Sequence, residues 1–230
     1  MKKIVVLSGS GISAESGLKT FRDMGGLWEQ YDVTQVASPV AWERDRSLVL
    51  RFYNERRKQL LETSPNRAHF ALAELEKDYD VQIITQNVDD LHERAGSSNI
   101  LHLHGEIRKA RSTKDSALIY DIDGWELKEG DECELGSQLR PHVVWFGESV
   151  PAVSEAIQIA KTADIFLVIG TSLNVYPAAG IIDYLPDKTI LFLVDPNAAG
   201  MKTGKKCTFI QEKATTGIEK FIEMIKNTHI

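Results

Sequence analysis

The feature that most constrains this chain is its beginning, where a short apolar strand runs directly into a glycine-rich turn. The segment 3–8 (Lys-Ile-Val-Val-Leu-Ser) is followed by Gly9, Ser10, Gly11 and Ala14, which fit the pattern G-x-G-x-x-G/A. In this pattern small residues let the backbone approach a pyrophosphate at a helix N-terminus. The turn makes a dinucleotide the first ligand to consider, although a lone glycine motif also fits an ordinary strand-to-helix turn.

The residues after this turn do not continue as in a typical dehydrogenase. A dehydrogenase site would have a long helix and a second apolar strand ending in an acidic residue. Here Glu15 is instead followed by a polar, glycine-rich segment that contains the aromatic residues Phe21 and Trp28. We expect this segment, with Arg22, to form a flap over a bound nucleotide.

Composition argues against several classes of protein. The 230 residues are 43% hydrophobic and 26% charged, which is typical of a globular chain with one main domain and insertions. The net charge of -6 and the lack of a basic tail argue against nucleic acid as a partner. The only cysteines, Cys133 and Cys207, cannot build a disulfide framework or a four-cysteine zinc site, which fits a reducing cytoplasm. The apolar run 4–7 is too short for a signal peptide, and no stretch is long enough for a bilayer, so we expect a cytoplasmic protein without a membrane partner.

Short apolar strands alternate with helical patterns along the chain. Strands are predicted near 3–8, 81–85, 99–104, 142–146, 164–172, 189–195 and 207–210, and helices near 41–62, 66–79, 153–163, from 177 and from 216. This alternation predicts an α/β fold, with a Rossmann-like parallel sheet covered by helices on both faces and a smaller inserted module. We expect one domain over 1–230. Its Rossmann-like large part takes about 1–35, 65–105 and 140–230, and its small part takes the helical insertion 36–64 and the insertion 106–139.

Polar side chains gather where two of these strands end. Gln86, Asn87 and Asp89 follow one strand, and Thr171 and Ser172 follow another after Gly170. Amides can bind hydroxyls and carboxamides by paired hydrogen bonds, and the carboxyl ends of parallel strands are where open sheets bind ligands. Asp89 also fits an N-cap for the next helix, and Thr and Ser are common turn residues.

His104 ends a predicted strand and precedes a glycine. Imidazole titrates near neutral pH, so a general base is one interpretation, and a hydrogen bond to loop backbone is another. A third interpretation takes His102, His104 and Glu106 as metal ligands on one strand face. We rank it lower, because Gly105 is expected to end the strand and no cluster elsewhere completes the set.

Several motifs together resemble those of the sirtuins, in order and in spacing, over nearly the whole chain. They are Gly9-Ser-Gly-Ile-Ser-Ala-Glu-Ser-Gly17 with Thr20-Phe-Arg22, Thr85-Gln-Asn-Val-Asp89 with Leu91-His92 and Ala95-Gly96, His102-Leu-His-Gly105, Val144-Trp-Phe-Gly-Glu148 and Gly170-Thr-Ser172. The resemblance implies an NAD-dependent protein-lysine deacylase, which transfers the acyl group to ADP-ribose and releases nicotinamide. Its partners would be NAD and acylated-lysine proteins or peptides.

The resemblance also implies a role for each matching residue. His104 would be the general base on a ribose hydroxyl. Asn87 would be the second catalytic residue and, with Asp89, would hold the ribose and the nicotinamide. Val144, Phe146 and Gly147 would bind the substrate peptide. The cofactor would be bound by Gly9, Ser10, Gly11, Ala14, Glu15, Phe21, Arg22, Trp28, Gln86, Asn87, Asp89, Gly170, Thr171, Ser172, Asp195 and Ala214.

Tyr53 and Arg56 resemble the Tyr-x-x-Arg pair with which bacterial class III sirtuins bind acidic acyl groups such as succinyl-lysine. An arginine and a phenol suit a carboxylate. The alternative is an amphipathic helix whose arginines face water. Met24 stands where class III members usually have a small alanine, which weakens the expectation of a desuccinylase or demalonylase.

The place of the sirtuin zinc module departs from the family pattern. The positions of the two cysteine pairs read 109–114 (Lys-Ala-Arg-Ser-Thr-Lys) and 131–136 (Asp-Glu-Cys-Glu-Leu-Gly), so we expect no zinc. Apolar packing would hold the module instead, by Ile107, Leu118, Ile119, Tyr120, Ile122, Trp125 and Leu135. This departure leaves open a non-catalytic NAD or ADP-ribose binding module, or an NAD hydrolase or ADP-ribosyltransferase. The retained peptide-binding stretch favours deacylation, and we expect a monomer.

Overall fold

The computed structural model describes residues 1–18, 33–198 and 203–227. Its main feature is a six-stranded sheet in the order β3-β2-β1-β7-β8-β9, in which all neighbouring strands run parallel. The strands are β1 (Lys3–Ser8), β2 (Asp80–Thr85), β3 (Ile100–His102), β7 (Ile165–Ile169), β8 (Ile190–Val194) and β9 (Cys207–Ile210). The predicted Rossmann-like α/β fold is confirmed.

The strand order places β1 at the middle of the sheet. From β1 the chain builds β2 and β3 on one side, and it later builds β7, β8 and β9 on the other. The order therefore reverses between β1 and β7, and open α/β sheets bind ligands in the crevice at such a reversal, beyond the carboxyl ends of the strands. Gly9 and Gly170 follow these two strands directly.

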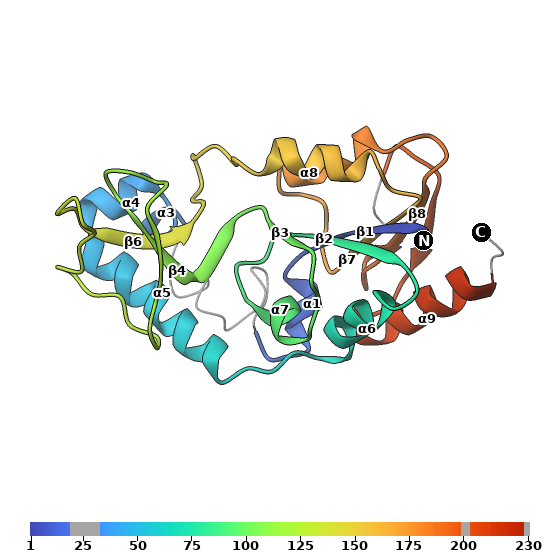
Figure 1. Ribbon diagram of the computed structural model, residues 1–230, viewed down its shortest axis with the longest axis horizontal. Helices are drawn as coiled ribbons and strands as arrows, with labels where there is room; N and C mark the ends of the chain where they lie inside the picture. Colours follow the sequence, from blue (N-terminus) through green and yellow to red (C-terminus); the bar gives the residue numbers. More distant parts are fainter. Residues whose placement is uncertain (19–32, 199–202, 228–230) are drawn as a thin grey trace.

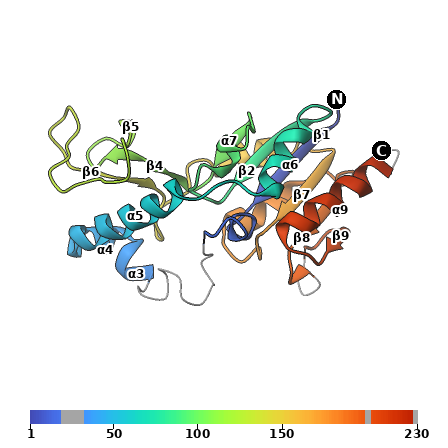
Figure 2. The ribbon, with the colours of Figure 1, turned by 90° about the horizontal axis from the view of Figure 1, so that it is seen from below.

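Helices cover both faces of this sheet (Figure 1). Ile4 and Val6 of β1 face a core shared with α6 and α9, whereas Val5 and Leu7 face a second core shared with α8 and the 3₁₀ helix η1. Burial on both faces explains why these strands are continuous apolar runs. α6 and α9 contact each other on the side of the sheet from which Figure 2 is seen. The elements are α6 (Arg67–Leu75), α8 (Val153–Ala160), η1 (Ala178–Tyr184) and α9 (Ala214–Asn227).

A smaller group of elements lies at one end of the molecule (Figure 1). It consists of α3 (Val33–Val36), α4 (Pro39–Arg44), α5 (Arg46–Leu61) and an antiparallel sheet of β5 (Ile119–Asp121), β4 (Gly105–Ser112) and β6 (Leu139–Val143), in that order. The helical pattern over 41–62 is two helices, because Asp45 ends α4 and caps α5 by accepting a hydrogen bond from Leu48 N at 2.9 Å.

The apolar packing predicted for the inserted module is only partly correct. Ile107 and Ile122 are buried with the helices of the small part, but Ile119, Trp125 and Leu135 are 44%, 39% and 46% exposed. Ile119 lies in the edge strand of the small sheet, and Trp125 and Leu135 lie outside its strands, so these side chains remain partly in water. Apolar packing therefore accounts for only part of what holds the module.

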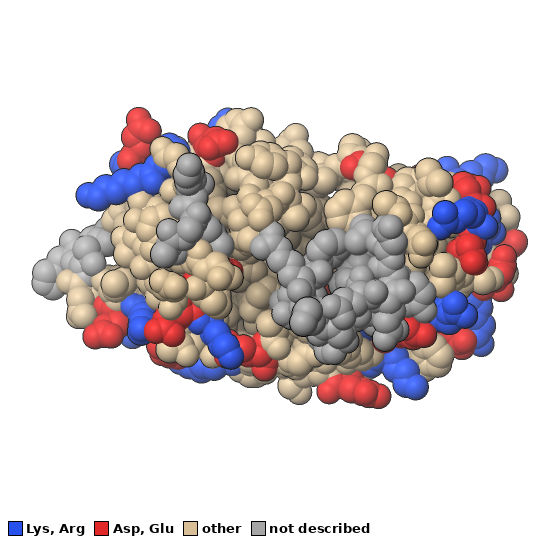
Figure 3. Space-filling view, turned by 180° about the vertical axis from the view of Figure 1, so that it is seen from behind, with Lys and Arg blue, Asp and Glu red and all other residues tan. Residues whose placement is uncertain are grey.

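Charges of both signs lie close together on the surface. On the face shown in Figure 3, acidic and basic side chains are interspersed at both ends of the molecule. Within the described ranges, no helix combines the length and the apolar character that a membrane span requires.

Candidate active site

The two glycine turns at the reversal point pack directly against each other. Gly9 N donates to Ile169 O at 3.1 Å, and Gly11 N donates to Gly170 O at 2.8 Å. A Cβ atom on Gly11 would lie 2.8 Å from the Gly170 Cα atom, and one on Gly9 would lie 2.6 Å from the Thr171 Cβ atom. Glycine is therefore required here for the approach of two turns, in addition to any approach of a ligand. The short helix α1 (Gly11–Ala14) starts from this contact.

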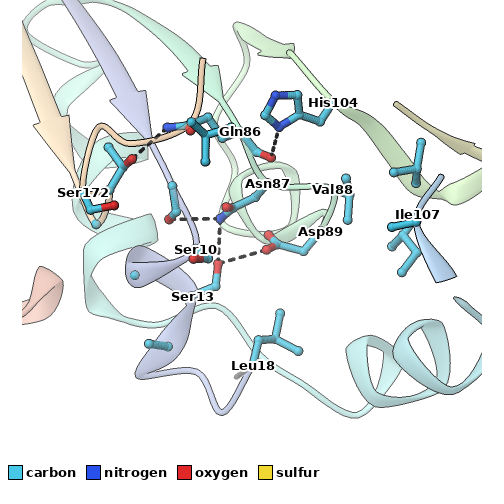
Figure 4. Close-up of a pocket in the computed structure, with 18 of the residues that line it drawn as sticks. Ser10, Ser13, Leu18, Gln86, Asn87, Val88, Asp89, His104, Ile107 and Ser172 are labelled. Atoms are coloured by element: carbon cyan, nitrogen blue, oxygen red, sulfur yellow. Dashed lines mark hydrogen bonds between the residues drawn. The ribbon is translucent and has the colours of Figure 1, made fainter. Parts of the chain in front are cut away.

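The amide and carboxylate after β2 are held in one hydrogen-bonded network (Figure 4). Asn87 Nδ2 donates to Gly9 O at 3.3 Å and to Ser13 Oγ at 3.1 Å, and Ser13 Oγ donates to Asp89 Oδ2 at 3.0 Å. Asp89 Oδ1 accepts from Leu91 N at 3.3 Å, at the start of α7 (Leu91–Arg94), but the N-cap residue of this helix is Asp90 and not Asp89, as the alternative interpretation had it. Burial raises the pKa of Asp89 to about 6.

Ser13 is a site residue that the sequence analysis did not single out. It lies within the segment Gly9–Gly17, but its central position depends on the pairing of β1 with β2, which brings residues far apart in the chain together. His69 and His92 were not predicted as site residues either, and contacts between distant segments place them as well. They lie next to this network, with ring centroids 5.0 Å apart. Burial lowers the pKa of both histidines, so both are neutral at neutral pH.

The prediction that His104 ends a strand is wrong, because β3 ends at His102 and His104 lies in the turn between β3 and β4. Gly105, with a φ of +80°, is the first residue of β4 and of the antiparallel sheet. His104 Nδ1 donates to Gln86 O at 2.9 Å, so the other nitrogen, Nε2, carries the lone pair of the neutral ring. Burial lowers the pKa of His104, which keeps this nitrogen unprotonated at neutral pH.

His102 is occupied in a different way. Its Nδ1 donates to Asn87 O at 3.0 Å, and its Nε2 contacts Glu93 Oε1 at 2.7 Å. Burial opposes protonation of His102, but the bond to Glu93 outweighs it and raises the pKa of the imidazole. Both ring nitrogens are thus in use, so the metal interpretation of His102, His104 and Glu106 is not supported. In the part of the chain that the structure describes, no group of three His, Cys, Asp or Glu side chains is arranged to hold a metal ion.

One cavity of about 1340 Å³ joins these groups. All predicted site residues that the structure describes line it: Gly9, Ser10, Gly11, Ala14, Glu15, Tyr53, Arg56, Gln86, Asn87, Asp89, His104, Val144, Phe146, Gly147, Gly170, Thr171, Ser172, Asp195 and Ala214. Phe21, Arg22 and Trp28 lie outside the described residues, as does Met24. The cavity runs past the reversal point of the sheet to α5 of the small part.

At the end of the cavity next to α9, the segment after the glycine turn is bonded to this last helix. Glu15 accepts hydrogen bonds from Thr215 N at 3.0 Å and from Thr215 Oγ1 at 2.9 Å, beside Ala214 at the start of α9. On the central strands, Gln86 Nε2 donates to Thr171 Oγ1 at 3.1 Å. These bonds join the ends of β1, β2 and β7 to the helix that covers them.

The opposite end of the cavity, in the small part, is formed by α5 and the stretch after β6. Tyr53 is 3% exposed, and its Oη accepts a hydrogen bond from Trp145 Nε1 at 3.0 Å. Burial raises the pKa of Tyr53 to about 12, so the phenol keeps its proton. Burial also lowers the pKa of Arg56, although the nearby Tyr53 and Asp89 oppose this shift, and an arginine remains charged. Val144 N and Phe146 N donate within the chain, to His104 O and Ala37 O.

Three side chains form a hydrogen-bonded cluster in the inserted module. Cys133 Sγ lies 3.3 Å from Ser112 Oγ and 3.2 Å from Ser137 Oγ, and the two hydroxyl oxygens are 2.8 Å apart. The hydrogen bonds with Ser112 and Ser137 lower the pKa of Cys133 to about 7. Ser112 and Cys133 fall within the two segments, 109–114 and 131–136, that the sequence analysis compared with the cysteine pairs of sirtuins.

Arg57 ties this module to α5. The residue is fully buried; its Nε donates to Ile107 O at 2.6 Å, and its Nη1 donates to Trp125 O at 2.7 Å and to Asn54 Oδ1 at 2.8 Å. Asn54 in turn accepts from Leu127 N at 3.0 Å. The sequence gives no direct signal for this role, because Arg57 lies next to Arg56 in a charged helix.

Comparison with known proteins identifies the family. The model of the Sir2 family matches residues 9–177, which is most of the chain. The chain belongs to the Sir2 family. A relative from Bacteroides thetaiotaomicron named NAD-dependent protein deacylase is 51% identical over 98% of either chain. A relative of the same name from Helicobacter pylori is 53% identical over 97% of this chain and 99% of its own.

A solved structure of a Sir2 homologue in complex with NAD has the same fold. It is 35% identical to this chain, covers 98% of it and 90% of its own length, and superposes with a TM-score of 0.88. These comparisons confirm the sirtuin assignment and the activity inferred from it, so the chain is an NAD-dependent protein deacylase.

Proposed function

We propose that this sirtuin removes acyl groups that end in a carboxylate, such as succinyl and malonyl groups, from lysine side chains, in addition to acetyl groups. The observation that carries the proposal is the placement of Tyr53 and Arg56 in the cavity that also contains His104. A buried phenol that keeps its proton and a guanidinium both donate hydrogen bonds, and together they suit a carboxylate. Met24 is the residue that argues against this preference.

The described residues fit NAD as the second substrate. Gly9, Gly11 and Gly170 leave no side chain between the backbone and a ligand, and a Cβ atom on any of them would collide with the facing turn. The polar groups of Gln86, Asn87 and Asp89 lie at the carboxyl end of β2, within the same cavity. When bound, NAD supplies the ribose to which the acyl group is transferred, with release of nicotinamide.

In this proposal each part of the cavity binds a different part of the two substrates. Asn87 and Asp89 orient the nicotinamide ribose, because Ser13 fixes both side chains. His104 takes a proton from a ribose hydroxyl at Nε2, since its Nδ1–H is held by Gln86 O. Val144, Phe146 and Gly147 bind the peptide on either side of the acyl-lysine. Asp195, Ala214 and Glu15 bind the adenosine half.

We also propose that the enzyme works without zinc, as a monomer in the cytoplasm, and as one domain with the division into large and small parts predicted from the sequence. The cluster of Ser112, Cys133 and Ser137 and the bonds of Arg57 support folding of the module without metal. Metal analysis and light scattering of the purified protein would test the first two points.

The main test is mass-spectrometric turnover of matched acetyl-lysine and succinyl-lysine peptides with NAD. We expect turnover of both peptides by the wild type and its loss in His104→Ala. Arg56→Met should lower kcat/KM for the succinyl peptide about 10-fold or more, because a charge-assisted hydrogen bond contributes about 1.5–3 kcal/mol. Arg51→Met is the matched control, since Arg51 lies on the exposed face of the same helix.

Two outcomes would contradict the proposal. If Arg56→Met affected the acetyl and succinyl peptides equally, the pair would not select the acyl chain. If NAD bound but neither peptide turned over, a non-catalytic binding module would replace the deacylase, and NAD consumption without peptide turnover would indicate NAD hydrolysis.

A further inference from the structure

A buried chain of contacts leads from the acyl end of the cavity to an ion-pair cluster behind it. Trp145 is 2% exposed and lies between the two, with its indole Nε1 donating to Tyr53 Oη at 3.0 Å. An indole N–H is a donor only, so the phenol oxygen must accept here, and its own hydrogen is directed elsewhere. Tyr53 lines the cavity, so an acceptor group of a substrate bound there could meet that hydrogen.

The indole is held in place from several sides. The guanidinium of Arg140 lies 3.3 Å from the centre of the Trp145 ring, and Trp42 packs against the same ring at 5.7 Å and an angle of 41°. The backbone N–H of Trp145 donates to Glu148 Oε2 at 2.8 Å. The orientation of the indole N–H is therefore fixed by packing and by a backbone bond together.

Glu148 joins these contacts into one cluster. Its carboxylate accepts hydrogen bonds from Arg140 Nη1 at 2.6 Å and from Arg111 Nη2 at 3.2 Å, and Arg140 Nη2 also donates to Val143 O at 3.0 Å. The Glu148 pKa is lowered, because the bonds from Arg140 outweigh burial. The carboxylate therefore stays charged and remains ion-paired with Arg140 at neutral pH.

From this geometry we propose that Trp145 is a positioning residue for acyl selection. By donating to the Tyr53 oxygen, the indole turns the phenol O–H toward the cavity, where it donates to the terminal carboxylate of an acidic acyl group. The inference rests on the proposed preference for acidic acyl chains. It adds a residue that acts on the acyl group through Tyr53.

The test uses Trp145→Phe, which keeps a ring against Arg140 and Trp42 and removes the indole N–H. The KM for a succinyl-lysine peptide should rise about 3- to 10-fold, as expected for one hydrogen bond, with kcat little changed. The KM for the matched acetyl-lysine peptide should stay the same, because an acetyl group has no terminal carboxylate. Trp42→Phe is the control for loss of a buried indole from the same cluster.

A double-mutant cycle separates positioning from general loss of packing. In a Tyr53→Phe background the phenol O–H is gone, so adding Trp145→Phe should not raise the succinyl KM further. An additive effect, or an equal rise for both peptides, would overturn the role of Trp145 while leaving the acyl preference of the wild type intact. A wild type that does not turn over the succinyl peptide would overturn the proposed function and this inference together.

Discussion

Arg57→Leu tests how a sirtuin module can be held by hydrogen bonds. Arg57 is fully buried and serves the carbonyl groups of Ile107 and Trp125 and the side chain of Asn54. A hydrogen bond from a charged donor contributes about 1.5–3 kcal/mol, so three of them contribute several kcal/mol together. The cost of burying the charge offsets part of this gain. Burial lowers the pKa of Arg57 to about 10, and a shift of this size corresponds to roughly 3 kcal/mol.

The net expectation is that Arg57→Leu lowers the free energy of unfolding by about 2–4 kcal/mol, because a leucine leaves two buried carbonyl groups without a donor. For a chain of this size, this loss would lower Tm by roughly 5–15 °C. The assay is urea and thermal unfolding followed by circular dichroism. Arg51→Leu, on the exposed face of α5, is the control and should change stability by less than about 0.5 kcal/mol. A loss below about 1 kcal/mol in Arg57→Leu would refute the reasoning, because it would mean that the carbonyl groups find other partners.

Two further predictions concern the site itself. Gly170→Ala should abolish NAD binding in a fluorescence titration, because Gly170 has a φ of +66° and an added Cβ atom would lie 2.3 Å from Ile12 N. Gly136→Ala has nearly the same φ of +65° and only a side-chain atom at 4.0 Å, so it should cost about 1 kcal/mol and leave NAD binding intact. Equal effects of the two substitutions would show that backbone strain, not turn packing, decides. Because burial raises the pKa of Asp89 to about 6, the folded protein binds this proton more tightly than the unfolded chain. Stability should therefore fall as the pH rises from about 4 to 6, and urea unfolding of Asp89→Asn should lack this contribution. An unchanged pH profile in Asp89→Asn would contradict the shift.

The sequence predicted those features of the fold and the site that depend on local patterns. Apolar runs such as 164–172 identified the parallel strands, because a strand buried on both faces needs no polar alternation. The rule that ligands bind beyond the carboxyl ends of parallel strands placed Asn87 and Gly170 at the site. The family resemblance added Tyr53 and Arg56, which a helical pattern alone would have left facing water.

The sequence could not predict the features that depend on which segments meet in space. Ser13 bridges Asn87 and Asp89 only because β1 lies beside β2. The packing predicted for the module was partly wrong, because Trp125 and Leu135 lie in exposed loops outside the strands of the small sheet. Arg57 was missed because a buried arginine has the same sequence signal as an exposed one until its partners are known.

The central place of β1 has a consequence for synthesis of the chain. The strand is made before β7, which is one of its two neighbours, and Lys3 N bonds Asp164 Oδ2 across a separation of 161 residues. At about 5–20 residues per second, the ribosome needs roughly 8–30 seconds to make that partner. During this interval one edge of β1 has no partner strand, and the turn at Gly9 has no facing turn at Gly170. The NAD site therefore cannot assemble until the ribosome has made β7 and the turn at Gly170, which makes NAD binding a late and sensitive indicator of complete folding.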